Sequence, residues 1–202
     1  MLNLSIISSG FYTCLCRALA SPEFLSKSFR LKIFAPEIND SVSNLSSVAG
    51  SSHFRIPVKP SIEDYRTIFN AATDFSEFIL VYSKNLIPSL IHNNFLCVNF
   101  HPSVLPRFPG LDGFEQAYAA GHLGFTAHFI DESIDLGPKI VSLKVAKPGS
   151  LSLCSATEIS SQMCTLATEY VLRLALGDSL KQSTYMHYEA DSLTHLKSDL
   201  LV

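Results

Sequence analysis

An amide and an imidazole stand at alternate positions near the end of a short apolar segment. Asn99 and His101 follow Cys97 and Val98, and Pro102 comes directly after them. Alternate side chains of a strand share one face, so both polar groups are expected to project together. Pro102 has no N–H to donate to a sheet, so it predicts the end of the strand. An amide donor beside an imidazole can stabilise an oxyanion and transfer a proton.

A third group is usually needed to hold such an imidazole and to tune its pKa. Asp135 is the candidate, because it lies in a predicted turn between two strands. An Asn-x-His pair at a strand end is more often a structural hydrogen-bonded pair than a catalytic one. The spacing alone therefore does not assign a reaction.

The elements that must position these groups alternate between strands and helices. Strands are predicted over residues 2–7, 31–35, 54–58, 78–82, 97–101, 124–130 and 139–145. Helices are predicted over residues 13–20, after Ser61, over 88–92, over 112–120 with Asp112 as cap, and from Ser155 to near Gly177. This alternation favours an α/β fold with a doubly wound, mostly parallel twisted sheet in a single domain.

The composition agrees with a buried sheet. The chain has 202 residues, a formal net charge of −3, 47% hydrophobic residues and only 16% charged residues. These values fit one domain over residues 1–177, followed by a polar tail at 178–202. The charge shows no basic excess and no apolar run has the length of a membrane span, so neither nucleic acid nor a membrane is expected as a partner.

Two further observations concern the compartment. The five cysteines are scattered, which indicates reduced thiols in a cytoplasmic protein rather than a zinc site or a disulfide framework. The uncharged N-terminal segment is interpreted as a buried first strand rather than a signal peptide, because no basic residue precedes it.

A longer pattern extends beyond the Asn-x-His pair. It comprises Asn99-x-His101-Pro102-Ser103-x-Leu105-Pro106-x-x-Pro109-Gly110, then Thr126-x-His128-Phe129 and Asp135-x-Gly137-Pro138. This pattern resembles the folate-dependent formyltransferases, above all the members that act on phosphoribosylglycinamide. The resemblance is strongest over residues 98–145, and it implies the Rossmann-like fold of that family.

The resemblance implies transfer of a formyl group from 10-formyltetrahydrofolate to a small-molecule amine, without a metal. Asn99 would steady the oxyanion, and His101 would polarise the formyl oxygen. Asp135 would orient His101 and help to move the amine proton. Thr126 and His128 would support these groups. Folate contacts are implied for Lys84, Asn85, Leu86, Ile130, Asp131 and Ile134.

The acceptor side departs from the family. Acceptor binding is implied for Gly10, Phe11, Tyr12, Thr13 and Pro102, where the family has a Gly-rich loop that holds a phosphate. Tyr12 replaces a glycine of that loop, and Cys14 replaces an asparagine. Met163 and Cys164 stand where the family carries a Glu-His pair.

Three functions therefore stay open. The chain could formylate phosphoribosylglycinamide in purine biosynthesis, formylate another amine such as an amino sugar nucleotide, or bind folate with little activity. The sequence also leaves open whether the protein forms a homodimer.

Overall fold

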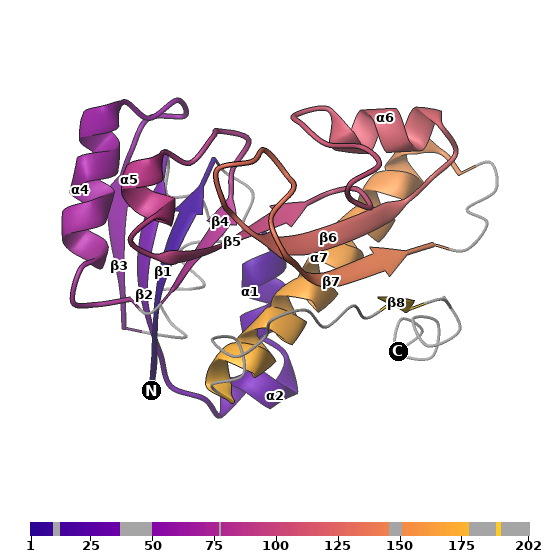
Figure 1. Cartoon of the computed structure of the whole chain (residues 1–202). Helices are drawn as coiled ribbons and strands as arrows, with labels where there is room; N and C mark the ends of the chain where they lie inside the picture. Colours follow the sequence, from indigo (N-terminus) through magenta and orange to yellow (C-terminus); the bar gives the residue numbers. More distant parts are fainter. Residues whose placement is uncertain (10–12, 37–49, 77, 146–150, 178–188, 191–202) are drawn as a thin grey trace.

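The computed structural model describes residues 1–9, 13–36, 50–76, 78–145, 151–177 and 189–190 (Figure 1). Its strands are β1 (Leu2–Ser8), β2 (Phe29–Ala35), β3 (Gly50–Arg55), β4 (Phe78–Tyr82), β5 (Leu96–His101), β6 (Gly124–Phe129), β7 (Lys139–Lys144) and β8 (Glu189–Ala190). Every strand predicted from the sequence is present. The bounds of β3 were predicted wrongly, because this strand begins at Gly50 rather than at residue 54 and ends before residues 56–58.

In the described part of the chain, eight strands form one sheet in the order β3-β2-β1-β4-β5-β6-β7-β8. The strands β1 to β5 pair in parallel, whereas β6 runs antiparallel to both β5 and β7. The order reverses between β1 and β4, which is the switch of a doubly wound sheet. The predicted α/β class with a mostly parallel sheet is confirmed. The short strand β8 lies within the segment predicted as a tail.

The helices are α1 (Thr13–Leu19), α2 (Pro22–Leu25), α4 (Ile62–Ala72), α5 (Ser89–His92), α6 (Gly113–Ala119) and α7 (Leu153–Leu176). Ser61 forms the expected cap of α4, in a reciprocal capping box with Asp64. Asp112 stands at the N-cap position of α6, as predicted, whereas the predicted cap of α7 is wrong. The side chain of Asp112 makes no capping bond, and α7 begins after Ser152 rather than at Ser155.

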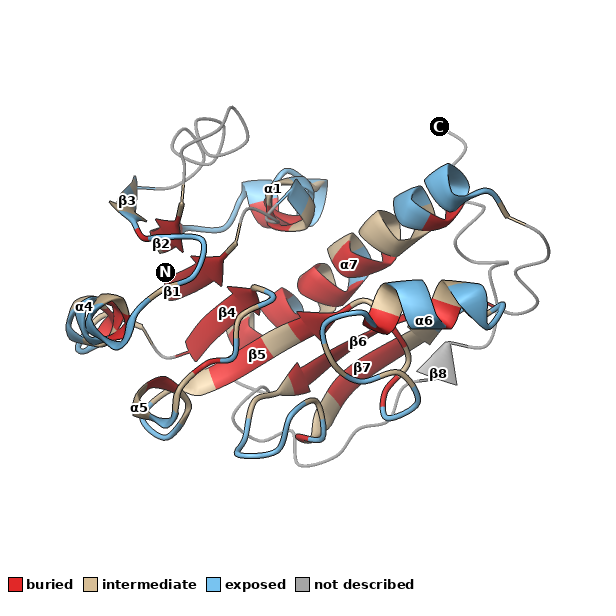
Figure 2. Cartoon of the chain, turned by 90° about the horizontal axis from the view of Figure 1, so that it is seen from above, coloured by how far each residue is buried: buried red, intermediate tan, exposed pale blue. Residues whose placement is uncertain are grey.

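The helices cover the two faces of the sheet unequally. In Figure 2, α1 and α7 lie on one side of the sheet, and α4 and α5 lie on the other. Along β5, Val98 and Phe100 pack in the cluster that includes α7, whereas Cys97 packs with α4 and α5. Because side chains alternate, Asn99 and His101 lie on the same face as Cys97. The pair of polar groups therefore faces away from α7.

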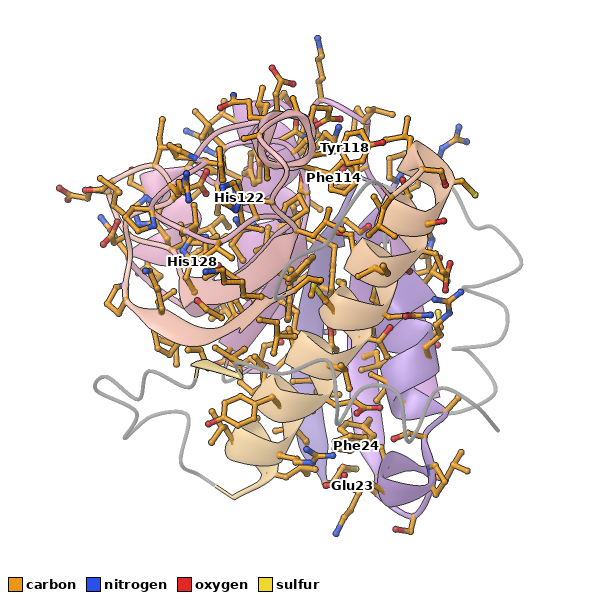
Figure 3. The ribbon with its side chains drawn as sticks, turned by 90° about the vertical axis from the view of Figure 1, so that its right-hand side faces the viewer. Glu23, Phe24, Phe114, Tyr118, His122 and His128 are labelled. Atoms are coloured by element: carbon orange, nitrogen blue, oxygen red, sulfur yellow. The ribbon has the colours of Figure 1, made fainter. Side chains whose placement is uncertain are left out.

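The long helix α7 is tied to the sheet and to α2. Its Thr168 hydroxyl lies 3.0 Å from the hydroxyl of Tyr82 on β4, and Arg173 forms an ion pair with Glu23. Glu23 and Phe24 lie beside the C-terminal end of α7 in Figure 3. None of the helices in the described residues is long and apolar enough to cross a bilayer.

Candidate active site

The antiparallel pairing of β5 with β6 assembles four polar side chains. Asn99 lies opposite His128, and His101 lies opposite Thr126. Directly opposed residues of an antiparallel pair project from the same face, so all four side chains point away from α7. Both imidazoles and the threonine are buried, whereas Asn99 is half-buried. The amide is thus the member of this group with most access to a bound molecule.

Asp135 reaches this group from the turn between β6 and β7. Its Oδ2 accepts the N–H of Gly110 at 2.7 Å and lies 3.5 Å from Nδ1 of His101. Its Oδ1 lies 3.5 Å from Nε2 of His128 (labelled in Figure 3). The backbone of Asp135 has a φ of 55°, a left-handed conformation that aspartate tolerates better than most residues. The structure therefore brings the three residues of the expected triad into one cluster.

The surroundings within this cluster lower the pKa values of Asp135 and His101. Burial by itself would raise the pKa of Asp135, but the hydrogen bond that a protonated His128 donates, the N–H of Gly110 and the charges of the two histidines in their protonated forms lower it to about 2. Burial lowers the pKa of His101, against the opposing effects of its bond to Phe108 and of the Asp135 carboxylate. At neutral pH the cluster therefore holds an ionised carboxylate and an uncharged His101.

The ring of His101 is oriented by the main chain of the following loop. Its Nε2 lies 2.8 Å from the carbonyl oxygen of Phe108, which can only accept, so Nε2 carries the proton. The same carbonyl accepts the hydroxyl of Ser103 at 2.7 Å. A Cβ at Gly113 would lie 2.5 Å from Nε2 of His101. The ring of His101 therefore fits at this position because Gly113 has no side chain. The sequence could not indicate Phe108, because it acts through its backbone.

His128 holds the amide of Asn99. Its Nδ1 lies 2.9 Å from the carbonyl oxygen of Phe129, so in the uncharged ring Nδ1 is the donor and Nε2 is free to accept. Nδ2 of Asn99 lies 3.1 Å from this Nε2. One N–H of the amide is therefore directed at His128, and the other remains for a further acceptor.

Thr126 fixes the loop after β5 rather than a reacting group. Its Oγ1 donates to the carbonyl of Ser103 at 2.8 Å and accepts the N–H of Leu105 at 3.1 Å. Pro102 is half-buried directly after β5. The turn that carries Phe108 and Gly110 is therefore anchored to β6.

The first segment expected to contact folate follows β4. The N–H of Lys84 donates to the hydroxyl of Ser9 at 3.3 Å, and Nδ2 of Asn85 donates to the carbonyl of Val58 at 2.7 Å. The side chain of Leu86 is exposed. These bonds fix the segment beside the end of β1.

The second expected segment follows β6. The N–H of Ile130 donates to the carbonyl of Cys97 at 2.9 Å, and Oδ1 of Asp131 accepts the N–H of Ser133 at 2.8 Å. Ile134 is exposed directly before Asp135. The main chain is thus folded into a compact turn that presents the catalytic candidate.

The acceptor side is described only in part. Gly10, Phe11 and Tyr12 lie outside the described residues, and Thr13 is exposed as the first residue of α1. Met163 and Cys164 lie on the buried face of α7 and pack in the core.

A known protein family matches the part of the chain that carries this cluster. Residues 70–147 match the model of the formyl transferase family, which includes Asn99, His101, His128 and Asp135. The resemblance to that family is confirmed. The chain is 51% identical over 45 residues to the phosphoribosylglycinamide formyltransferase of Bacillus subtilis, and 42% identical over 50 residues to that of Escherichia coli. These alignments span only 23% and 24% of those relatives, and 21% and 24% of this chain.

Solved structures agree in fold over most of the chain. Glycinamide ribonucleotide transformylase 1 from Symbiobacterium toebii aligns with a TM-score of 0.72 and 20% identity, over 88% of this chain and 89% of that chain. A formyltetrahydrofolate deformylase from Pseudomonas syringae aligns with the same TM-score and 17% identity, over 88% of this chain and 62% of that chain. The predicted Rossmann-like formyltransferase fold is confirmed.

Proposed function

We propose that this protein transfers a formyl group from 10-formyltetrahydrofolate to the amine of phosphoribosylglycinamide. The observation that carries the proposal is the joining of Asn99, His101, His128 and Asp135 into one hydrogen-bonded cluster at the end of β5. The names of the matching relatives supply the acceptor.

Asn99 provides the donor for charge that develops on the formyl oxygen. The N–H of its amide that does not face His128 is free to bind an oxyanion as the amine attacks the formyl carbon. The second donor is Nε2 of His101, which must exchange its bond to Phe108 for one to the formyl oxygen. Ser103 keeps that carbonyl paired during the exchange.

Asp135 supplies negative charge. A carboxylate with a pKa of about 2 is a weak base, so its main effect is to stabilise the positive charge that develops on the attacking amine. Nδ1 of the uncharged His101 faces this carboxylate with a free lone pair. Proton movement from the amine toward the departing folate nitrogen is therefore assigned to these two residues together.

The segments expected to bind folate fit a flat, partly apolar ring system. Leu86 follows β4 and Ile134 precedes Asp135, and both leave large apolar side chains exposed to solvent. Apolar side chains with adjacent main-chain polar groups are the usual lining of a small-molecule site. Lys84, Asn85, Ile130 and Asp131 complete the proposed contacts, and Thr13 and Pro102 are proposed for the acceptor.

We also propose that the protein is a cytoplasmic enzyme whose substrates are small molecules. Its five cysteines are free thiols, which suits a reducing compartment. All contacts described above lie within a single copy of the chain, so none of them requires a homodimer.

The test measures release of tetrahydrofolate by absorbance, with purified protein and 10-formyltetrahydrofolate. Three reactions are compared. The first contains phosphoribosylglycinamide as acceptor, the second contains an amino sugar nucleotide, and the third contains no acceptor. Release with phosphoribosylglycinamide supports the proposal. Release with the sugar nucleotide alone would assign a different acceptor, and folate binding without any release would remove the activity.

Variants test the cluster itself. Asn99→Ala and Asp135→Asn should each lower kcat roughly 10²–10³-fold, the effect of losing one group that stabilises developing charge. Matched controls are Asn94→Ala in the turn before β5 and Asp112→Asn on the exposed start of α6. Equal turnover in the variants and their controls would reject the proposed roles.

A further inference from the structure

Two thiols on neighbouring helices lie outside the cluster of polar groups on β5 and β6. Cys14 is the second residue of α1 and is partly exposed, whereas Cys164 is buried on α7. Cys14 packs against the core cluster that contains Cys164, and its Sγ contacts the carbonyl of Ser161, three residues before Cys164 on α7. The residues are 150 positions apart in the sequence, so the contact depends on the packing of α1 against α7.

The sulfur of Cys14 lies against one turn of α7. Its Sγ donates to the carbonyl of Ser161 at 3.5 Å, and its other partners are the side chains of Ser161, Cys164 and Thr165. Residues at i, i+3 and i+4 are neighbours on one helix face. Cys164 therefore lies on the turn of α7 that Cys14 contacts.

The surroundings divide the roles of the two sulfurs. The hydrogen bond from Cys164 lowers the pKa of Cys14 to about 7 despite burial, with help from Ser161, Thr165 and the charge of Arg17. The guanidinium of Arg17 is held nearby, because it donates to the hydroxyl of Ser161 at 3.1 Å. Burial and the neighbouring Cys14 raise the pKa of Cys164. The accessible Cys14 therefore loses its proton before the buried Cys164 does.

We propose that Cys14 and Cys164 are an oxidisable pair, which a hydroperoxide converts into a disulfide that joins α1 to α7. The proposal does not rest on the proposed formyl transfer, although Cys14 directly follows Thr13, which is proposed for the acceptor.

The chemistry takes two steps. The Cys14 thiolate attacks one peroxide oxygen, the O–O bond breaks, and the other oxygen leaves and takes up a proton to give water or an alcohol. Cys14 is then a sulfenic acid. The sulfur of Cys164 attacks the sulfur of Cys14, the S–O bond breaks, and the hydroxyl leaves with the thiol proton as water. Two thiols lose two electrons, and the hydroperoxide gains them.

The other thiols are less suited to start this reaction or to complete it. Burial raises the pKa of Cys16 to about 11 and that of Cys97 to about 12, so both remain protonated at pH 7. Cys154 is exposed near the start of α7, more than two turns away from Cys164. Cys16 and Cys154 can therefore be replaced by serine without removing either member of the proposed pair.

The experiment treats the full chain carrying Cys16→Ser and Cys154→Ser with hydrogen peroxide at pH 7. Non-reducing peptide mapping should find the tryptic peptide that ends at Arg17 joined to the one that ends at Arg173. Intact mass should fall by about two hydrogens per chain, and dithiothreitol should reverse the change.

Two further variants make the result decisive. Cys164→Ser should leave a sulfenic acid on Cys14 that a cyclic 1,3-diketone traps, and Cys14→Ser should leave Cys164 unmodified by the same peroxide dose. Direct oxidation of Cys14 to the sulfinic acid while Cys164 stays free would overturn the proposal. So would equal peroxide reactivity of Cys164 in the presence and absence of Cys14.

Discussion

Nδ2 of Asn99 lies 3.1 Å from Nε2 of His128, across the antiparallel pair of β5 and β6. Since Nδ1 of His128 donates to the carbonyl of Phe129, the uncharged ring has only Nε2 left to accept. The ring of His128 therefore determines the orientation of the Asn99 amide, with Nδ2 directed toward the ring. A side chain that never touches substrate can in this way control the donor that does.

Replacing His128 with Phe should keep the packing volume and remove the acceptor for Asn99. The amide then rotates freely, so kcat should fall roughly 10²-fold while KM for folate stays nearly constant. Steady-state kinetics measure both constants. His92→Phe on α5 is the control, because this half-buried histidine has no place in the cluster. A rise in KM with unchanged kcat would mean that His128 supports binding instead.

Asp135 should contribute to stability in a defined pH window. Its pKa of about 2 in the folded chain lies below the ordinary value of about 3.9, so the unfolded chain binds the proton first as the pH falls. The contribution is complete above pH 4 and is lost toward pH 2. It amounts to about 2 kcal/mol.

Urea unfolding of the wild type and of Asp135→Asn between pH 6 and pH 2 measures this contribution. Asparagine also tolerates a positive φ, so the variant should keep the turn. The stability advantage of the wild type should shrink as the pH falls. A difference that stays constant across the range would show that Asp135 is not the titrating group.

Gly113→Ala should displace the ring of His101. The added Cβ would lie 2.5 Å from Nε2 and 2.8 Å from the carbonyl oxygen of Phe108, which is too close for either contact to survive. We expect kcat to fall at least 10-fold, since a shift of this size misplaces a catalytic group. Gly50→Ala is a fair control, because nothing lies within 4 Å of its Cβ position. Wild-type kinetics for Gly113→Ala would argue against the assigned position of the imidazole.

Ser103→Ala should slow turnover without weakening substrate binding. The carbonyl of Phe108 would then depend on His101 alone, and leaving it unpaired costs about 1–3 kcal/mol. This cost corresponds to a kcat that is roughly 10-fold to 100-fold lower. Ser5→Ala removes an equally buried hydroxyl far from the cluster and should leave kcat unchanged. Parallel losses in both variants would indicate a general effect on folding.

The sequence predicted most of the sheet because its strands are short apolar runs separated by clear turns. It also predicted that Asn99 and His101 share a face, which the alternation along β5 confirms. The start of α7 was missed by one turn, since Ser152 and Ser155 are equally good caps by residue type. Only the fold decides between them.

The support of the candidate site was less accessible to sequence reasoning. Phe108 and Gly110 act through a carbonyl and an N–H, and residue type does not record such bonds. Gly113 matters because it has no Cβ, which would lie too close to the ring of His101. The helix α2 went unpredicted because four residues are too few to show a helical period.

The register of β6 has a consequence for how the protein becomes active during folding. Slipping β6 by one residue would turn His128 and Thr126 toward α7 and bring Ala127 to the polar face. Such a chain could still collapse around the same apolar strands, yet Asn99 would lack its partner. Recovery of turnover after dilution from denaturant therefore reports the correct docking of β6, and it should lag behind the recovery of compactness.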